Sequence, residues 1–126
     1  MKFTASLNKN YEFKRLYNKG KNAASKYAVV YCLKTGRPFN RLGITVSTKL
    51  GGAVQRNRVR RRLKEIYRLN ENSLRTGFNI VLVARVRSRD AGWGELHSSV
   101  MSLLNKLDLV KNNTGTGICD KDKSTI

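Results

Sequence analysis

A long basic segment that follows Gly51 and Gly52 constrains the fold of this chain more than any other feature. Its apolar residues recur at helical spacing, at positions i, i+4, i+7 and i+8: Val59, Leu63, Ile66 and Tyr67. At about 100° per residue these side chains form one narrow stripe, and arginine and lysine crowd the rest of the helix. The stripe must pack on a core, and the cationic face must point at something else.

Other segments predict strands and two further helices. Residues 8–18 form a short helix that closes at Gly20, and residues 26–34 and 41–47 form an antiparallel hairpin across Pro38. Residues 78–84 form a buried strand. A last helix follows Ser88 or Asp90, either of which could cap it. Its apolar stripe is expected to pack on the sheet and contains Trp93, Leu96, Val100, Leu103, Leu104 and Leu107.

Together these elements predict an α/β fold with a single layer of mostly antiparallel sheet packed with helices, in the order αββ(β)αβα. The strand in brackets is a weakly signalled one near residues 21–24. Residues 1–110 are expected to form one domain, and residues 111–126 a disordered polar tail that has too little apolar surface to offset the entropy of ordering.

The charge balance indicates an anionic partner. The chain has 26 Lys and Arg against 8 Asp and Glu, a formal net charge of +18, and a charge of that size destabilises a compact state unless something offsets it. RNA is the expected partner. No apolar run is long enough to span a membrane, and no signal peptide is visible, so the chain is expected in the cytoplasm. Cys32 and Cys119 lack the spacing of a zinc site and are expected to be free thiols.

The basic segment carries the candidate RNA-binding residues. The arc opposite the apolar stripe contains Arg58, Arg60, Arg61, Arg62, Lys64 and Arg68. Arg56 falls on the apolar side of the wheel, so we place it at the helix start, beside Asn57, projecting past the core edge. The free N–H groups of a glycine-led helix start can hold phosphate there. A merely solvated face is the simpler alternative, but only Glu65 is nearby to balance these charges.

Aromatic residues form a second candidate site. Phe13 and Tyr17 are four residues apart on the first helix, and Tyr27 and Tyr31 alternate onto one side of a strand. Such rings could line a cleft for single-stranded RNA, whose bases stack on aromatic side chains. From spacing alone, core packing remains the more common role for such a pair.

A catalytic constellation is not apparent in the sequence. The one histidine, His97, lies near the apolar stripe of the last helix and is assigned to packing. Outside the tail, no pair of carboxylates has the spacing of metal ligands or of an acid and base couple. These observations argue against a nuclease that acts without an RNA subunit.

Residues 41–65, RLGITVSTKLGGAVQRNRVRRRLKE, resemble the bacterial ribonuclease P protein component, whose signature is a strand, a Ser-x-Lys turn and an RNR helix. The resemblance extends from about Leu7 to Leu107. It implies a protein that assists a catalytic RNA in removing the 5′ leader from precursor tRNA and performs no bond cleavage itself. It also implies a fold like ribosomal protein S5 domain 2, with a left-handed βαβ crossover through the RNR helix.

The same resemblance implies roles for individual residues. Contacts to the catalytic RNA are implied for Ser47, Lys49, Arg56, Asn57, Arg58, Arg60 and Arg62, and the leader cleft is implied for Phe13, Tyr17 and Tyr31. Mg²⁺ would be held mainly by the RNA and none by the protein alone. The protein would broaden substrate binding and lower the Mg²⁺ requirement. Gly52 departs from the asparagine that the family commonly has there, which puts a side-chain hydrogen bond at that position in doubt.

Other functions remain open from the sequence. A structural RNA-binding protein of the ribosome would share the small size, the basic charge and the α/β layer. A metal-dependent nuclease fits less well, because no carboxylates have the spacing of metal ligands. A membrane-surface protein also fits less well, because the apolar stripe of the basic helix is expected to pack on the core. The sequence does not determine the oligomeric state.

Overall fold

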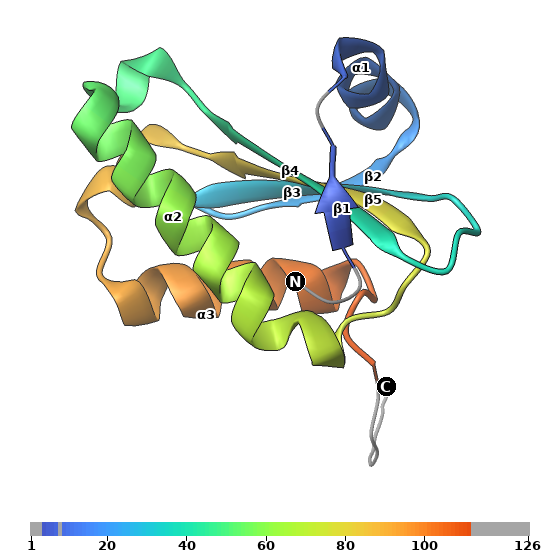
Figure 1. Ribbon diagram of the computed structural model, residues 1–126. Coiled ribbons are helices and arrows are strands. Elements are labelled where there is room, and N and C mark those ends of the chain that lie inside the picture. Colours follow the sequence, from blue (N-terminus) through green and yellow to red (C-terminus); the bar gives the residue numbers. More distant parts are fainter. Residues whose placement is uncertain (1–3, 8, 112–126) are drawn as a thin grey trace.

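The computed structural model describes residues 4–7 and 9–111, which form a five-stranded sheet with three α-helices (Figure 1). The strands are β1 (Thr4–Ser6), β2 (Lys21–Ala24), β3 (Ala28–Lys34), β4 (Asn40–Val46) and β5 (Phe78–Ala84). The helices are α1 (Asn10–Lys19), α2 (Ala53–Asn70) and α3 (Trp93–Lys106), with short 3₁₀ turns η1 (Thr48–Leu50), η2 (Glu71–Ser73) and η3 (Val86–Asp90). The predicted α/β class is confirmed, and so is the strand at residues 21–24.

The order of strands in the sheet differs from the expected hairpin. The order is β1-β4-β5-β3-β2, so β5 lies between β3 and β4, which do not pair with each other. β5 runs antiparallel to β3 and parallel to β4, while β1 pairs with β4 in parallel and β2 pairs with β3 antiparallel. The sheet is therefore evenly mixed, not mostly antiparallel. β5 is buried along most of its length, which suits a central position.

The connection from β4 through α2 to β5 is left-handed. In Figure 1, β1 is nearest the viewer, so the strand order places β4 in front of β5. β4 runs to the left, α2 returns to the right on the lower side of the sheet, and β5 runs left again behind β4. The path from β4 through α2 to β5 thus turns anticlockwise as it moves away from the viewer, which is the left-handed sense. Left-handed connections make up only about 2% of crossovers between parallel strands of one sheet. The left-handed crossover agrees with the one implied by the resemblance.

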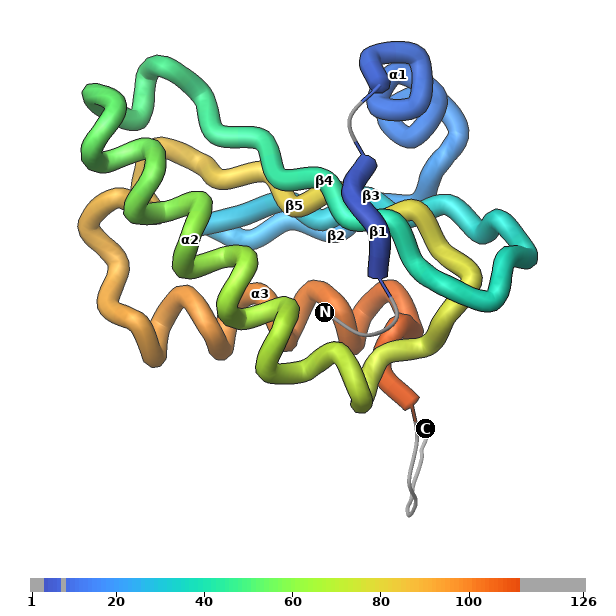
Figure 2. Tube along the Cα trace, in the orientation of Figure 1, coloured from blue at the N-terminus to red at the C-terminus, as the bar shows by residue number. Residues whose placement is uncertain are grey.

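The three helices divide between the two faces of the sheet (Figure 2), with α2 and α3 on one face and α1 on the other. The main core lies under α2 and α3, where alternate residues of β3 (Ala28, Val30 and Cys32) are buried. The predicted stripe of α2 is confirmed, because Val59, Leu63, Ile66 and Tyr67 are its buried residues. No helix in the described part of the chain could cross a membrane.

Helix α1 rests on a smaller cluster. Leu16 packs with Leu7 and Val81, and the ring of Phe13 lies against Gly43 of β4. A Cβ atom at Gly43 would come within 2.7 Å of that ring, so the absence of a side chain there lets α1 approach the sheet. Glu12 is buried beneath the helix and forms a bidentate ion pair with Arg41 of β4.

Details near the ends of elements differ from the sequence-based prediction. The three-residue strand β1 was not predicted. Neither Ser88 nor Asp90 caps α3: both belong to η3, and the helix begins after Gly92, whose N–H donates to Oε1 of Glu95 at 3.1 Å. Lys111 is hydrogen-bonded to Ser73, and the rest of the predicted tail, with Cys119, lies outside the described residues. Cys32 is a free, buried thiol, as predicted.

Candidate nucleic-acid interface

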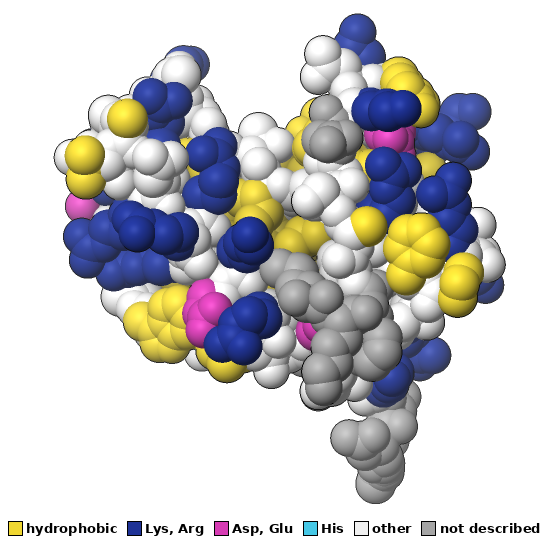
Figure 3. All heavy atoms as spheres, in the orientation of Figure 1, with side chains coloured by type: hydrophobic (Ala, Val, Ile, Leu, Met, Phe, Trp, Pro, Cys, Tyr) yellow, Lys and Arg dark blue, Asp and Glu magenta, His cyan; other side chains and the backbone are white. Residues whose placement is uncertain are grey.

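The outer face of α2 carries a dense group of exposed cations, and Figure 3 shows a continuous cluster of Lys and Arg over this helix. Arg58 and Arg61 are exposed and have no hydrogen-bond or ion-pair partner among the described residues. Arg68 is paired with Glu65 at 2.6 Å, and this bond lowers the pKa of Glu65, which keeps the carboxylate ionised. Most of the predicted cations are therefore available to an external anion.

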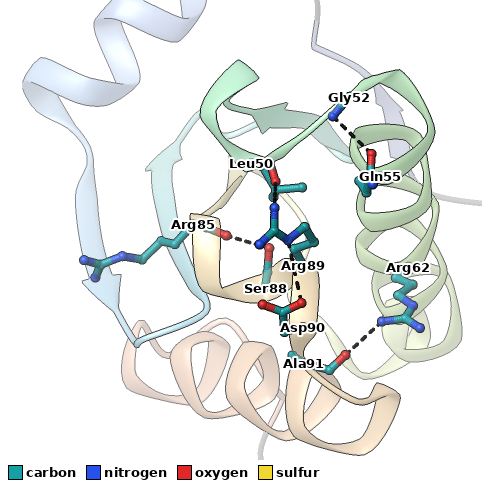
Figure 4. A network of polar contacts seen from close by, with 9 residues as sticks. All are labelled: Leu50, Gly52, Gln55, Arg62, Arg85, Ser88, Arg89, Asp90 and Ala91. Carbon is teal, nitrogen blue, oxygen red and sulfur yellow. Dashed lines mark hydrogen bonds and ion pairs between the residues drawn. The ribbon is translucent and has the colours of Figure 1, made fainter.

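The two edges of α2 face different surroundings. Arg60 and Lys64 line a cavity of about 450 Å³ that β1 and β4 close on the other side. On the opposite edge, Nη1 of Arg62 donates to the carbonyl oxygen of Ala91 at 2.9 Å, which ties α2 to the segment before α3 (Figure 4). The basic residues predicted from the helical wheel thus form one surface with two distinct sides.

The segment before α2 places polar groups at the helix start. Ser47 and Lys49 are exposed, and the Ser47 hydroxyl accepts a hydrogen bond from the Lys49 N–H at 3.1 Å. The N–H of Gly52 donates to Oε1 of Gln55 at 3.1 Å (Figure 4), so this backbone donor is already used. By helix geometry, the N–H groups of the next residues have no intrahelical acceptor and remain candidates for phosphate.

Asn57 and Arg56 lie in the first turns of α2, as predicted. Asn57 is exposed, and its Oδ1 is 3.4 Å from Nη1 of Arg60. Arg56 is half-buried, and its Nε atom is buried without a hydrogen-bond partner. The side chain therefore does not project freely past the core edge, although its position at the helix start is confirmed.

Sequence reasoning missed three arginines after β5, of which Arg89 lies at the start of α2, whereas Arg85 points away from α2 and its Nη1 donates to the carbonyl oxygen of Ser25 at 3.0 Å (Figure 4). Arg85, Arg87 and Arg89 follow β5, and η3 packs beside η1 at the start of α2 (Figure 4). Nη1 of Arg89 donates to the carbonyl oxygen of Leu50 at 3.1 Å, which couples the two turns. Arg87 is exposed. In the sequence, arginine at every second position after β5 was the signal that could have indicated these additional cations.

The aromatic residues of α1 and β3 form a second group. The ring centroids of Tyr17 and Tyr31 are 4.8 Å apart with the planes at 72°, and those of Phe13 and Tyr17 are 6.5 Å apart. Tyr17 is 40% exposed, while Phe13 and Tyr31 are half-buried against the α1 cluster. Tyr27 does not join them, because its hydroxyl donates to Glu95 of α3 on the other side of the sheet.

Metal-ligating side chains do not form a large cluster in the described part of the chain. No group of three or more His, Cys, Asp or Glu side chains in residues 4–7 and 9–111 could hold a metal ion. Glu12 and Glu65 are held by Arg41 and Arg68, respectively, and His97 lies against Asn70 and Trp93. The expectation that Mg²⁺ is held mainly by an RNA partner stays a prediction.

Comparisons with known proteins agree with this geometry. The family model described as Ribonuclease P matches residues 1–108. The chain is 43% identical over 107 residues to the ribonuclease P protein component of Clostridioides difficile, covering 84% of this chain and 94% of that protein.

Solved structures show the same relationship. The RNase P protein of Thermotoga maritima has a TM-score of 0.72 at 29% identity, covering 85% of this chain and 98% of that one. A Staphylococcus aureus RNase P protein mutant described as having defective mRNA degradation activity has a TM-score of 0.77 at 30% identity, covering 82% and 88%. Matches of this extent, on a fold that exposes a basic RNR helix, show that the chain belongs to the ribonuclease P protein family.

Proposed function

We propose that this chain is the protein subunit of a ribonucleoprotein that removes the 5′ leader from precursor tRNA, with α2 binding the catalytic RNA and the α1 cleft receiving the leader. Family membership supports the role in tRNA 5′ processing and the partnership with ribonuclease P RNA. The division of labour between the two surfaces, and the assignment of the chemistry to the RNA, belong to the proposal.

One observation carries the assignment of α2. Its cations lie together on the exposed face, and the single carboxylate among them, Glu65, is neutralised by Arg68. A phosphate neutralised by such a cation releases its condensed counterions, so binding gains free energy that falls steeply with salt. Arginine adds bidentate geometry on phosphate oxygens. This face is therefore suited to the backbone of a folded RNA.

The two edges of α2 support a finer assignment. Arg58 and Arg61 face outward and are free to contact the catalytic RNA. Arg60 and Lys64 face the cavity beside β1 and β4. A single strand of precursor RNA that runs from the catalytic centre of the RNA subunit toward the sheet would pass through this cavity. The helix would then contact both RNAs and reduce the repulsion between their backbones.

The aromatic group supports the leader cleft. Tyr17 and Tyr31 form an edge-to-face pair, and Tyr17 keeps 40% of its surface exposed. Exposed rings beside cations hold single-stranded RNA without strict sequence preference, because every base has a face that can stack. Phe13, held on Gly43, would form the floor of this cleft.

In this proposal the protein binds and positions, and it supplies no catalytic group. By adding fixed positive charge where two RNAs meet, it would lower the Mg²⁺ concentration needed for substrate binding and cleavage. Mg²⁺ would be held mainly by the RNA. The protein would act in the cytoplasm, where it would meet precursor tRNA.

The direct test is the rate of 5′ leader removal by the cognate catalytic RNA at low Mg²⁺, with and without the protein. Strong stimulation together with an inactive protein-only control is expected. No stimulation would overturn the proposal and favour the ribosomal alternative, which the family match already disfavours. Cleavage by the protein alone would overturn the assignment of chemistry to the RNA; the mRNA degradation activity named for the Staphylococcus aureus mutant makes this control essential.

A second test separates leader binding from core packing. Tyr17→Ala is expected to weaken binding of leader-bearing precursor by about 1–3 kcal/mol and to leave mature tRNA unaffected, since one stack on a base is lost. Tyr11→Ala is the matched control, because Tyr11 lies on the same helix, is 66% exposed and is not paired with Tyr31. Equal losses for both RNAs with Tyr17→Ala would contradict the cleft.

A further inference from the structure

Trp93, the one tryptophan of the chain, does not take the packing role that its sequence position predicts. It was expected in the apolar stripe of α3, yet it is 41% exposed at the first residue of that helix. Leu96 and Val100 fill the core from the same helix and are fully buried. The indole is thus left at the surface, beside Gly94, around which there is open space.

The indole is nevertheless held in a defined position. Its ring lies 6.2 Å from the His97 ring, with the two planes tilted by 31°. Nε2 of His97 is 3.1 Å from Nδ2 of Asn70, which also donates to the carbonyl oxygen of Ile66 at 2.8 Å. The histidine is therefore fixed to α2, and it supports the indole from one side. A fixed ring with an exposed surface loses little entropy when a second flat group stacks on it.

The charges around Trp93 indicate which kind of partner would cover it. Arg62 donates to Ala91, two residues before the indole, so the ring lies beside the cationic edge of α2. Figure 3 shows hydrophobic surface directly below the cluster of Lys and Arg on α2, with acidic side chains beside it. An apolar protein surface would have to desolvate these cations, whereas an RNA can neutralise them through its phosphates and place a base on the ring.

We propose that Trp93 is a stacking platform for one unpaired base of the catalytic RNA that the outer face of α2 binds. This inference rests on the proposed function and adds a contact that charge alone does not supply. His97 acts as a positioning residue beneath the indole. The contact would add to the phosphate contacts an interaction with an unpaired base, which only an RNA with an unstacked nucleotide at that position can make.

The tryptophan makes its own test possible, because all indole fluorescence of the protein comes from this residue. Titration of the full-length protein with the catalytic RNA at fixed salt is expected to quench the emission, with saturation at the concentration that saturates binding in a filter assay. Emission that stays unchanged while the filter assay shows saturated binding would overturn the platform and leave the proposed function standing. If the protein shows no salt-sensitive binding to the catalytic RNA at all, both the platform and the proposed function are overturned.

Variants give the matching energetic test. Trp93→Ala is expected to weaken binding of the catalytic RNA by about 5- to 150-fold, the range for one lost stack, with the slope of affinity against salt unchanged because no phosphate contact is lost. Trp93→Phe, which keeps an aromatic face, should restore most of the affinity. Tyr11→Ala is the control, since Tyr11 is an aromatic residue that is 66% exposed on α1, on the other face of the sheet, and this variant should bind the catalytic RNA as the parent does.

Two outcomes of that series would contradict the platform. Equal weakening by Trp93→Ala and Trp93→Phe, or an affinity unchanged in Trp93→Ala, would show that no base stacks there. Sedimentation of the free protein distinguishes a contact between copies: a dimer that Trp93→Ala dissociates would assign this surface to self-association and overturn the proposal.

Discussion

Helices α1 and α2 lie on opposite faces of one sheet, and they are attached in very different ways. Helix α2 buries Val59, Leu63, Ile66 and Tyr67 in the main core, whereas α1 buries only Leu16 and the carboxylate-bearing Glu12. The surface proposed for the catalytic RNA is thus built on a firmly packed element. The proposed leader cleft depends on a helix held by a small cluster and one ion pair. Because the two helices are attached by different contacts, we expect that mutations can disturb one surface without the other.

The largest effect is expected from Glu12→Ala. Removing the carboxylate leaves Arg41 partly buried without its partner, which should reduce the free energy of unfolding by about 3 kcal/mol. Urea denaturation measures this loss. Because α1 alone is loosened, discrimination between leader-bearing and mature tRNA should fall while binding of the catalytic RNA persists. If leader discrimination and binding of the catalytic RNA fall together, the two surfaces are not separable.

A smaller effect is expected from Gly43→Ala, which tests the approach of α1 without touching a charge. The new methyl group would meet the Phe13 ring, so the ring or the helix must shift, at a cost of about 1–3 kcal/mol in unfolding free energy. Gly94→Ala is the matched control, because nothing lies within 4 Å of the added atom and alanine favours a helix. A neutral Gly43→Ala variant with full leader discrimination would refute the close contact.

The smallest effect is expected from single cations on α2. Arg58→Ala should weaken binding of the catalytic RNA by about 1 kcal/mol and reduce the slope of log affinity against log salt by about 1. Lys106→Ala removes the same charge from the exposed end of α3 and should change neither value appreciably. Equal responses of the two variants would mean that net charge, and not the α2 face, determines binding.

Sequence patterns predicted the elements better than their arrangement. The stripe of α2 and the run of β5 were recoverable because burial imposes a period on the residues. The pairing of strands was not, since Pro38 and Gly36 signal a turn between β3 and β4 but do not report that β5 inserts between them. β1 has three residues, too few to show alternation.

The candidate site shows the same limit. The cations of α2 were predictable because a helical wheel assigns them to the face opposite the core. Tyr27 was placed with Tyr31 by strand alternation, but it precedes β3 and turns toward Glu95 of α3. Trp93 was assigned to the packed stripe of α3 because helical spacing cannot reveal that the first residue of the helix stays exposed.

The insertion of β5 between β3 and β4 also determines when this protein can fold during its synthesis. The first four strands emerge from the ribosome with the central position of the sheet still empty, and β3 and β4 have no partner in each other. The basic helix is therefore translated before the core that is to receive its apolar stripe exists. Until residue 84 has emerged, this highly cationic segment lacks the complete sheet on which its apolar stripe packs, so its folding must wait for the late central strand.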